Sequence, residues 1–180
     1  LEEFMDTLDA IFSRQSIGEL KPDPVPVELI EKLLSAAVQA PNHYKVRPWR
    51  FVVLTGTGLE KMGAVLAQSF AEKFPTAPSS ALDKESAKPL RAPLLIAVGV
   101  DKPSEPKVLE IENICAAAAA VENLLIAAHA LGLGAKWRTG EDANNPRLKE
   151  FLGLEPGQHL IALLYIGFPA GEAKPVERPG

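Results

Sequence analysis

Cysteine is almost absent from this chain. Cys115 is the one cysteine among 180 residues. An intramolecular disulfide needs two cysteines, and a zinc site built on thiolates needs several, so both are excluded. A chain that does not depend on disulfides suits a reducing compartment, and we therefore expect a cytoplasmic protein.

An excess of basic residues is also lacking. The chain carries 19 Lys and Arg against 23 Asp and Glu, for a formal net charge of -4. Its cations are scattered along the sequence rather than clustered. Binding to nucleic acid or to an anionic membrane depends on concentrated positive charge. We therefore expect neither nucleic acid nor a membrane as a partner.

Only one apolar run approaches the length of a membrane span. Residues 114–133 are almost uniformly apolar, but Glu122, Asn123 and His129 interrupt them. A charge near the centre of a membrane span is costly, so the run predicts a buried core helix instead. Alanines fill residues 116–120, and we expect close helix packing there because small side chains let another backbone approach.

Several catalytic signatures are missing as well. The sequence contains no G-x-S-x-G elbow, no Walker loop and no G-x-G-x-x-G fingerprint, which argues against a hydrolase and a Rossmann domain. Cys115, Glu122 and His129 share one helical stripe, but their seven-residue spacing separates them by about 10 Å. One metal ion cannot bridge that distance, so we expect no metal site there.

Hydrophobic periodicity divides the chain into helices and strands within a single domain, residues 1–180. Helical spacing predicts helices over residues 1–13, 27–40, 59–73, 114–133 and 145–151. Apolar runs predict strands over residues 49–54, 93–100, 135–140 and 159–167. Residues 74–88 predict a mobile loop with a short exposed helix. Because helices separate the strands, we expect a layered α/β or α+β domain with helices packed on a central sheet.

Functional side chains gather in three short segments. Arg14-Gln15-Ser16 follows the first helix, where the arginine either complements the helix dipole or helps the serine to clamp a phosphate. Residues 40–49 (APNHYKVRPW) form a proline-bounded loop rich in polar side chains, either a solvated surface loop or a binding site. Residues 136–140 (KWRTG) are flanked by glycines. They are either a plain strand end or a place where a ligand approaches the backbone closely.

In this order and spacing, the three segments resemble the nitroreductase family over residues 12–169. The resemblance implies an α+β fold with a central, mainly antiparallel sheet flanked by helices, in an intertwined homodimer. It also implies an FMN site at the subunit interface, to which different chains contribute. The residues that correspond to the family's flavin contacts are Arg14, Gln15, Ser16, Gln39 and His43 on one side and Trp137, Arg138 and Thr139 on the other.

The same resemblance implies an activity. NADH or NADPH would reduce the flavin, and a small-molecule acceptor, such as a nitroaromatic or a quinone, would then take the electrons in a ping-pong reaction. No acid or base residue is required, because the cofactor carries the chemistry. Two alternatives stay open. One is another flavin reaction on the same fold, such as dehalogenation, enone reduction or flavin fragmentation, and the other is a non-enzymatic flavin-binding protein.

The sequence departs from the family pattern at one position. Many larger relatives carry a cation two residues after the serine, near N1 and O2 of the flavin, whereas this chain has Gly18 there. Reduced flavin is negatively charged at that edge, and nearby positive charge raises its potential. Arg138 or Lys45 could supply this charge instead.

Overall fold

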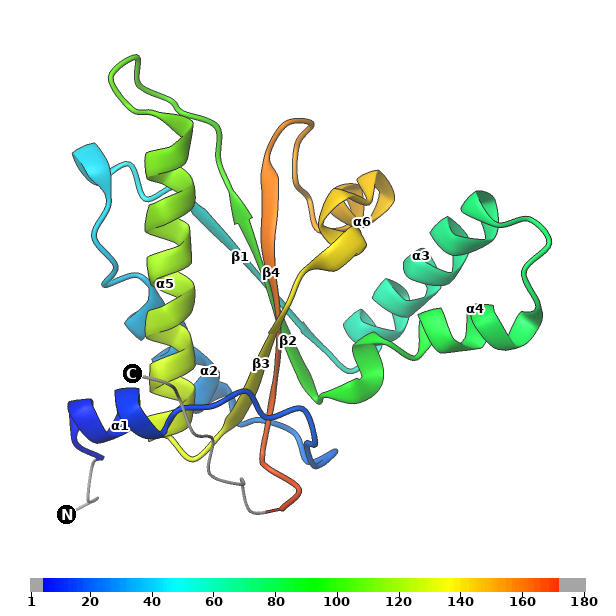
Figure 1. Cartoon of the computed structure of the whole chain (residues 1–180), viewed down its shortest axis with the longest axis horizontal. Helices are drawn as coiled ribbons and strands as arrows, with labels where there is room; N and C mark the ends of the chain where they lie inside the picture. Colours follow the sequence, from blue (N-terminus) through cyan, green and yellow to red (C-terminus); the bar gives the residue numbers. More distant parts are fainter. Residues whose placement is uncertain (1–4, 172–180) are drawn as a thin grey trace.

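A four-stranded sheet organises the computed structural model, which describes residues 5–171 (Figure 1). The strands lie in the order β1-β2-β4-β3, and each pairs antiparallel with its neighbour. They are β1 (Trp49–Thr55), β2 (Leu94–Val100), β3 (Gly134–Arg138) and β4 (His159–Gly167). The α+β class and the antiparallel sheet predicted from the sequence are therefore confirmed.

β2 lies in the middle of the sheet, and all of its residues are buried. A continuous apolar run is what a strand covered on both faces requires. Because successive side chains point to opposite faces, the strand contributes to two separate cores. Ile96 and Val98 pack into one core, whereas Leu95 and Ala97 pack into the other.

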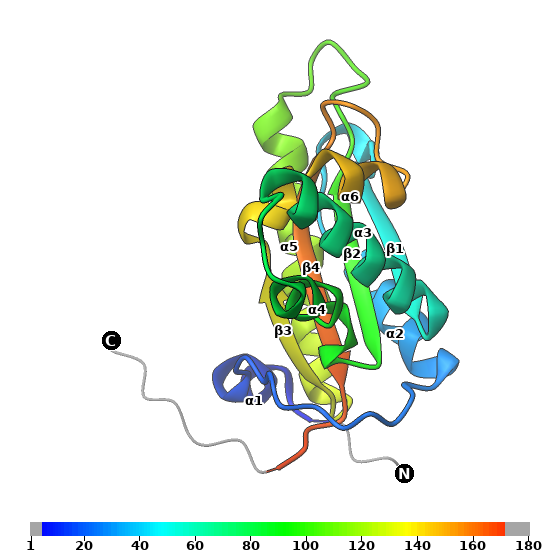
Figure 2. The same ribbon diagram turned by 90° about the vertical axis from the view of Figure 1, so that its right-hand side faces the viewer.

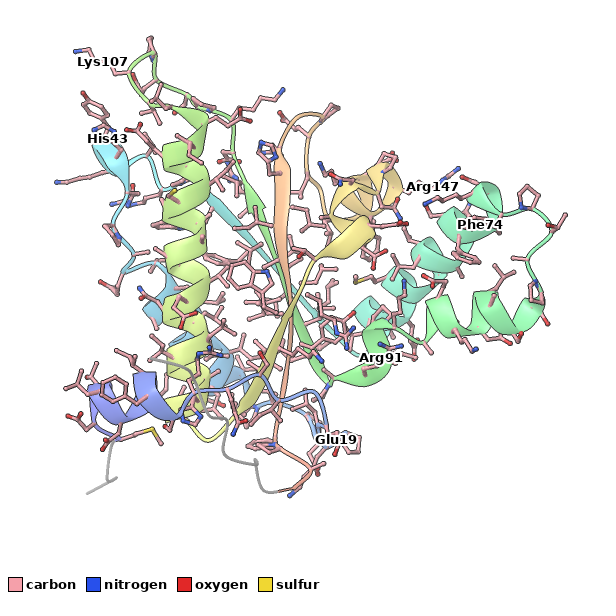
Figure 3. All side chains as sticks on the ribbon, in the orientation of Figure 1. Glu19, His43, Phe74, Arg91, Lys107 and Arg147 are labelled. Carbon is pink, nitrogen blue, oxygen red and sulfur yellow. The ribbon has the colours of Figure 1, made fainter. Side chains whose placement is uncertain are left out.

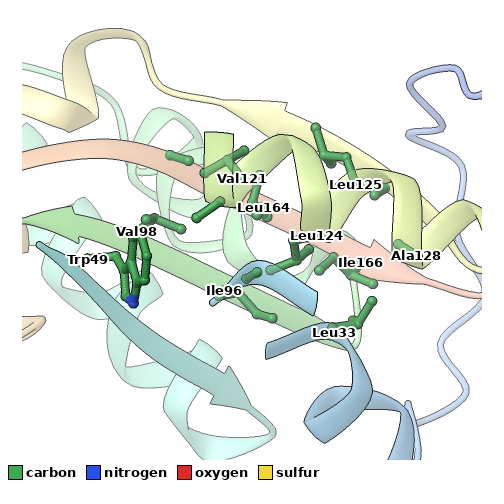
Figure 4. Close-up of a cluster of buried hydrophobic side chains, with 14 of the residues drawn as sticks. Leu33, Trp49, Ile96, Val98, Val121, Leu124, Leu125, Ala128, Leu164 and Ile166 are labelled. Carbon is green, nitrogen blue, oxygen red and sulfur yellow. The ribbon is translucent and has the colours of Figure 1, made fainter. Parts of the chain in front are cut away.

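The long alanine-rich helix α5 (Glu110–Ala130) covers the first of these faces (Figure 4). Its own residues Ala117, Val121 and Leu124 are fully buried. α2 (Val27–Ala37) packs beside α5, and the Nδ2 of Asn123 donates a hydrogen bond to the backbone oxygen of Ala36 at 3.3 Å. The predicted core helix is confirmed, and α2 is the helix that packs against it.

By length and composition alone, α5 would also be able to cross a membrane. The residues of its inner face nevertheless belong to the same core cluster as β2 and β4. A helix that packs on a sheet in this way needs no lipid to cover that face.

The opposite face of the sheet is covered by three shorter helices, which lie in front of it in Figure 2. They are α3 (Thr57–Lys73), α4 (Ser79–Ser86) and α6 (Pro146–Phe151). Met62 and Leu148 are fully buried there. α4 is the short exposed helix predicted within residues 74–88, and the short turn η2 (Pro89–Arg91) joins it to β2.

The first helix is shorter than the sequence predicts. α1 spans Thr7–Ser13, and the side chain of Asp6 accepts a hydrogen bond from the backbone N–H of Leu8 at 2.9 Å. Asp6 caps the helix from outside it, and residues 1–4 lie outside the described part of the chain. The apolar stripe of α1 faces outward, with Leu8 59% and Phe12 74% exposed.

Two other helices end or begin away from their predicted boundaries. α2 ends at Ala37 because residues 38–40 turn ahead of Pro41. α5 begins four residues early, at Glu110, because Glu112 accepts a hydrogen bond from the backbone N–H of Leu109 at 2.8 Å. That bond satisfies a donor left without a partner inside the helix.

Substitution of Gly63 tests how closely α3 packs on α4. A Cβ at this position would stand 2.2 Å from the backbone oxygen of Ser86, so the helices would have to separate. Alanine normally stabilises a helix interior by about 1 kcal/mol over glycine. Here we expect overpacking to cost about 1–3 kcal/mol instead, measured as a lower Tm for Gly63→Ala.

The matched control is Gly58→Ala, whose Cβ would meet only the flexible side chain of Leu54, at 3.4 Å. Its Tm should stay the same or rise. A Tm for Gly63→Ala as high as that of Gly58→Ala would contradict the close approach of the two helices.

Candidate functional site

The segment after α1 runs along the free edge of the sheet. β3 is an edge strand, and Ser16 forms a parallel bridge with Ala135. The backbone N–H of Ile17 donates a hydrogen bond to the carbonyl oxygen of Ala135 at 2.9 Å. The first and third functional segments, distant in sequence, are therefore neighbours in the fold.

Arg14 ends α1 and is held against α5. Its Nε lies 3.3 Å from Oε1 of Glu122, and Oγ of the preceding Ser13 lies 2.7 Å from Nε2 of His129. Burial, and then the positive charge of Arg14, lower the pKa of His129. These contacts hold the guanidinium against α5, two residues before Ser16 joins the edge of β3.

β3 carries cations on one face and an indole on the other. Lys136 lies directly opposite Tyr165 of β4, and Arg138 points to the same face because side chains alternate along a strand. The guanidinium of Arg138 lies 5.7 Å from the ring centroid of Tyr165. Trp137 points to the other face, where its Nε1–H donates to the carbonyl oxygen of Ile161 at 2.9 Å.

A cavity of about 800 Å³ opens beside the end of β3. The strand stops at Arg138, two residues before its predicted end, because Thr139 turns the chain into η3 (Gly140–Asn144). The cavity lies between this turn, α3, α4 and the cation-bearing face of the sheet, on the side of Phe74 and Arg91 in Figure 3. Its walls include Phe70, Phe74, Lys88, Arg91, Arg138 and Thr139.

The second functional segment forms a strained loop beside the N-terminal half of α5. It contains the turn η1 (His43–Lys45), where Nδ1 of His43 lies 2.8 Å from Oε1 of Glu112. The backbone N–H of Leu109 and then His43 lower the pKa of Glu112. Tyr44 and Lys45 adopt φ angles of 49° and 56°, which are uncommon outside glycine and often mark binding sites.

The eight predicted contact residues fall into separate groups. Ser16 pairs with β3, the strand that ends with Trp137 and Arg138, and Arg14 and Gln15 directly precede Ser16 in sequence. Of the eight, Arg138 and Thr139 line the cavity. His43 contacts Glu112, whereas Arg14 contacts Glu122, ten residues and therefore about 15 Å further along α5. Gln39 donates from Nε2 to the backbone oxygen of Ser35 at 3.2 Å. A single chain therefore does not gather all eight residues around one ligand.

Comparison with known proteins identifies the family of this fold and these segments. Residues 11–168 match the model of the nitroreductase family. The chain belongs to the nitroreductase family. It is 34% identical over 166 residues to YdjA of Escherichia coli strain K12, which is named as an NAD(P)H nitroreductase. The matching region covers 92% of this chain and 89% of that protein.

Solved structures of nitroreductases share the fold. A nitroreductase-like protein from Bacillus cereus superimposes with a TM-score of 0.85 at 26% identity, over 100% of this chain and 94% of that one. A Desulfovibrio desulfuricans protein, described as a nitroreductase in complex with FMN, has a TM-score of 0.73 at 30% identity, over 97% and 92% of the two chains. The family resemblance read from the three segments is therefore confirmed.

The nitroreductase pattern alone does not point to Lys136, which the structure brings to the same edge. A Cβ on Gly18 would have the Cδ and Nζ of Lys136 as its nearest neighbours, at 3.2 and 3.4 Å. Of the two substitutes suggested by the sequence, Lys45 lies in η1 and Arg138 at the end of β3, so neither is the cation beside Gly18. The sequence could not reveal the position of Lys136, because that position depends on the pairing of residues 16 and 135, which are far apart in the chain.

His129 reports on the charge of Arg14. Because burial and this charge both lower its pKa, we expect its NMR signal to titrate below the ordinary value of about 6.5. Arg14→Gln should raise that pKa, and His129→Gln assigns the signal.

The same depressed pKa links stability to pH. The unfolded chain binds a proton to this histidine more readily, so this contribution to stability is complete above pH 6.5 and is lost as the pH falls. His129→Gln should flatten that part of the profile. An imidazole pKa that does not respond to Arg14→Gln would contradict the proximity of the two side chains.

Proposed function

We propose that this nitroreductase is an FMN-dependent oxidoreductase that transfers electrons from NADH or NADPH to nitroaromatic, quinone or similar acceptors by a ping-pong mechanism. One observation carries the proposal. The pairing of Ser16 with Ala135 joins the arginine-serine segment to β3, and this strand leads into Arg138 and Thr139, which line a large cavity. The names of the Escherichia coli relative and of the FMN-bound Desulfovibrio structure support the donor and the cofactor. We expect this reaction in the cytoplasm, since nothing in the sequence depends on a disulfide.

The chemistry of the β3 edge fits FMN. A flavin mononucleotide combines a planar ring with a phosphate, and the edge offers Arg14 for the phosphate with Gln15 and Ser16 as neutral hydrogen-bonding partners. A cavity of about 800 Å³ lies within the range of about 300–1,000 Å³ typical of cofactor sites. When bound, the flavin would accept a hydride from the nicotinamide and return the electrons to the acceptor.

The residues of this chain would bind and orient rather than react. Arg138 and Thr139 stand where β3 opens into the cavity, so they would contact the ring of the flavin. The remaining cavity would receive the nicotinamide and the acceptor in turn, which is what a ping-pong reaction requires. Phe74 and Lys88, on either side of α4, line its outer wall, and we propose that residues 74–88 cover the acceptor and exclude water.

We also propose that the site is completed in a homodimer, with Gln39 and His43 supplied by the partner chain. Phe12 is 74% and Leu8 59% exposed, and Ile111 is exposed on the outer face of α5. Exposed apolar side chains of this size are candidates for an interaction surface. A second copy packed on α1 and α5 would cover them and bring its own loop toward the β3 edge.

Flavin content tests this function most simply. Purified protein should take up FMN, and NADH or NADPH should bleach the bound flavin in anaerobic stopped flow. Comparing nitroaromatic, quinone, enone and halogenated acceptors for reoxidation then separates the proposed activity from other flavin reactions. A protein that binds FMN but is reduced by neither nicotinamide would be a flavin-binding protein instead. A protein that cannot be loaded with FMN would refute the proposal.

Arg14→Ala tests the phosphate contact. Loss of a hydrogen bond to a charged group costs about 1.5–3 kcal/mol, so FMN affinity should fall by about 10- to 100-fold. Arg50→Ala is the matched control, because Arg50 lies on the opposite edge strand and pairs with Asp101 at 2.9 Å. Equal FMN dissociation constants for Arg14→Ala and Arg50→Ala would remove Arg14 from the site.

A further inference from the structure

Gly18 has no side chain, and the side chain of Lys136 lies against its backbone. The three heavy atoms nearest to a Cβ built on Gly18 are Cδ, Nζ and Cε of Lys136, at 3.2, 3.4 and 4.0 Å. The position does not have the positive φ that would demand glycine. Glycine is therefore needed at this position for steric reasons and not for its backbone conformation. The end of the Lys136 side chain lies where a side chain at position 18 would otherwise lie.

Backbone pairing fixes this crossing. Ser16 bridges Ala135, and the N–H of Ile17 donates to the carbonyl oxygen of the same residue at 2.9 Å. Lys136 follows Ala135 directly, so its side chain leaves β3 at the point where the residue 16–18 segment runs alongside. The backbone of Gly18 and the side chain of Lys136 thus lie against each other.

The ammonium of Lys136 has no acidic partner within the described residues 5–171, where no carboxylate lies within 4.0 Å of it. Two of the cations that line the cavity do have such partners: Lys73 lies 2.9 Å from Glu141, and Lys88 pairs with Glu85. Around Lys136, the charged neighbours are Arg138 on the same face of β3 and Glu19 next to Gly18 in sequence. A cation held in place by backbone pairing, yet not neutralised there, is suited to an anionic ligand.

We propose that Lys136 supplies the positive charge beside the N1 and O2 edge of the flavin, in place of a side chain at position 18. The assignment rests on the proposed FMN site. Negative charge develops at that edge when the flavin is reduced, so a nearby ammonium binds reduced FMN more tightly than oxidised FMN and raises the reduction potential. In this chain, the positive charge that raises the flavin's reduction potential thereby comes from β3 rather than from the segment after α1.

The potential of the bound flavin tests the assignment. Lys136→Met keeps the length of the side chain and removes its charge. We expect reduced FMN to lose about tenfold more affinity than oxidised FMN, which for a two-electron couple lowers the midpoint potential by about 30 mV. Anaerobic spectroelectrochemical titration of the FMN-loaded protein measures this shift. Lys61→Met, at an exposed position on α3, is the control and should leave the potential unchanged.

A double variant that moves the positive charge from residue 136 to residue 18 separates the effect of the charge from any effect of the substitution on folding. Lys136→Ala clears the gap, and Gly18→Lys in the same chain returns an ammonium from the other segment. This double variant should recover most of the potential lost in Lys136→Ala alone, with the melting temperature of the FMN-free proteins as a check on folding. A merely structural role of Lys136 would not be rescued in this way.

The other outcomes are equally decisive. An unchanged potential in Lys136→Met, with FMN still bound, would overturn the assignment and leave the proposed function standing. A shift in Lys45→Met instead would assign the charge to the η1 loop and overturn it as well. Failure of the unaltered protein to bind FMN would refute the proposed function, and this assignment with it.

Discussion

The two backbone contacts that hold residues 16 and 17 to Ala135 are the constraint on which the rest of the site depends. α1 alone is a seven-residue helix, too short to be stable in isolation. Once the following segment joins the edge of β3, Arg14 meets α5 and Gly18 meets Lys136. Residues from distant parts of the sequence then lie side by side, and Arg138, at the end of β3, lines a cavity of about 800 Å³.

α5 has two roles that follow from its composition. Its alanine-rich inner face lets α2 approach and closes one core of the sheet. Its length also separates the loop that carries His43, near Glu112, from Arg14, near Glu122. Within one chain the two halves of the expected flavin site therefore lie apart. The exposed apolar residues of α1 suggest how a second chain would restore the missing half.

Sequence patterns predicted the parts of the fold that local periodicity controls. β2 and the alanine-rich helix were found because their burial requires continuous apolar residues, and α6 because Pro146 marks its first turn. Helix ends were displaced where one side chain decides the boundary, such as the Asp6 cap of α1. The position of Lys136 over Gly18 depends on a pairing between distant segments, which periodicity does not encode.

The central claim is that each flavin site is built by two chains, and complementation in mixed dimers tests it most directly. Arg14→Ala and His43→Ala chains would be purified separately, unfolded together, refolded with FMN and titrated for high-affinity sites. If Arg14 and His43 serve one flavin from different chains, a mixed dimer has one intact site, and about one site in four of an equal mixture recovers full affinity. If both residues serve the flavin from the same chain, no mixture recovers a high-affinity site, and the account is wrong.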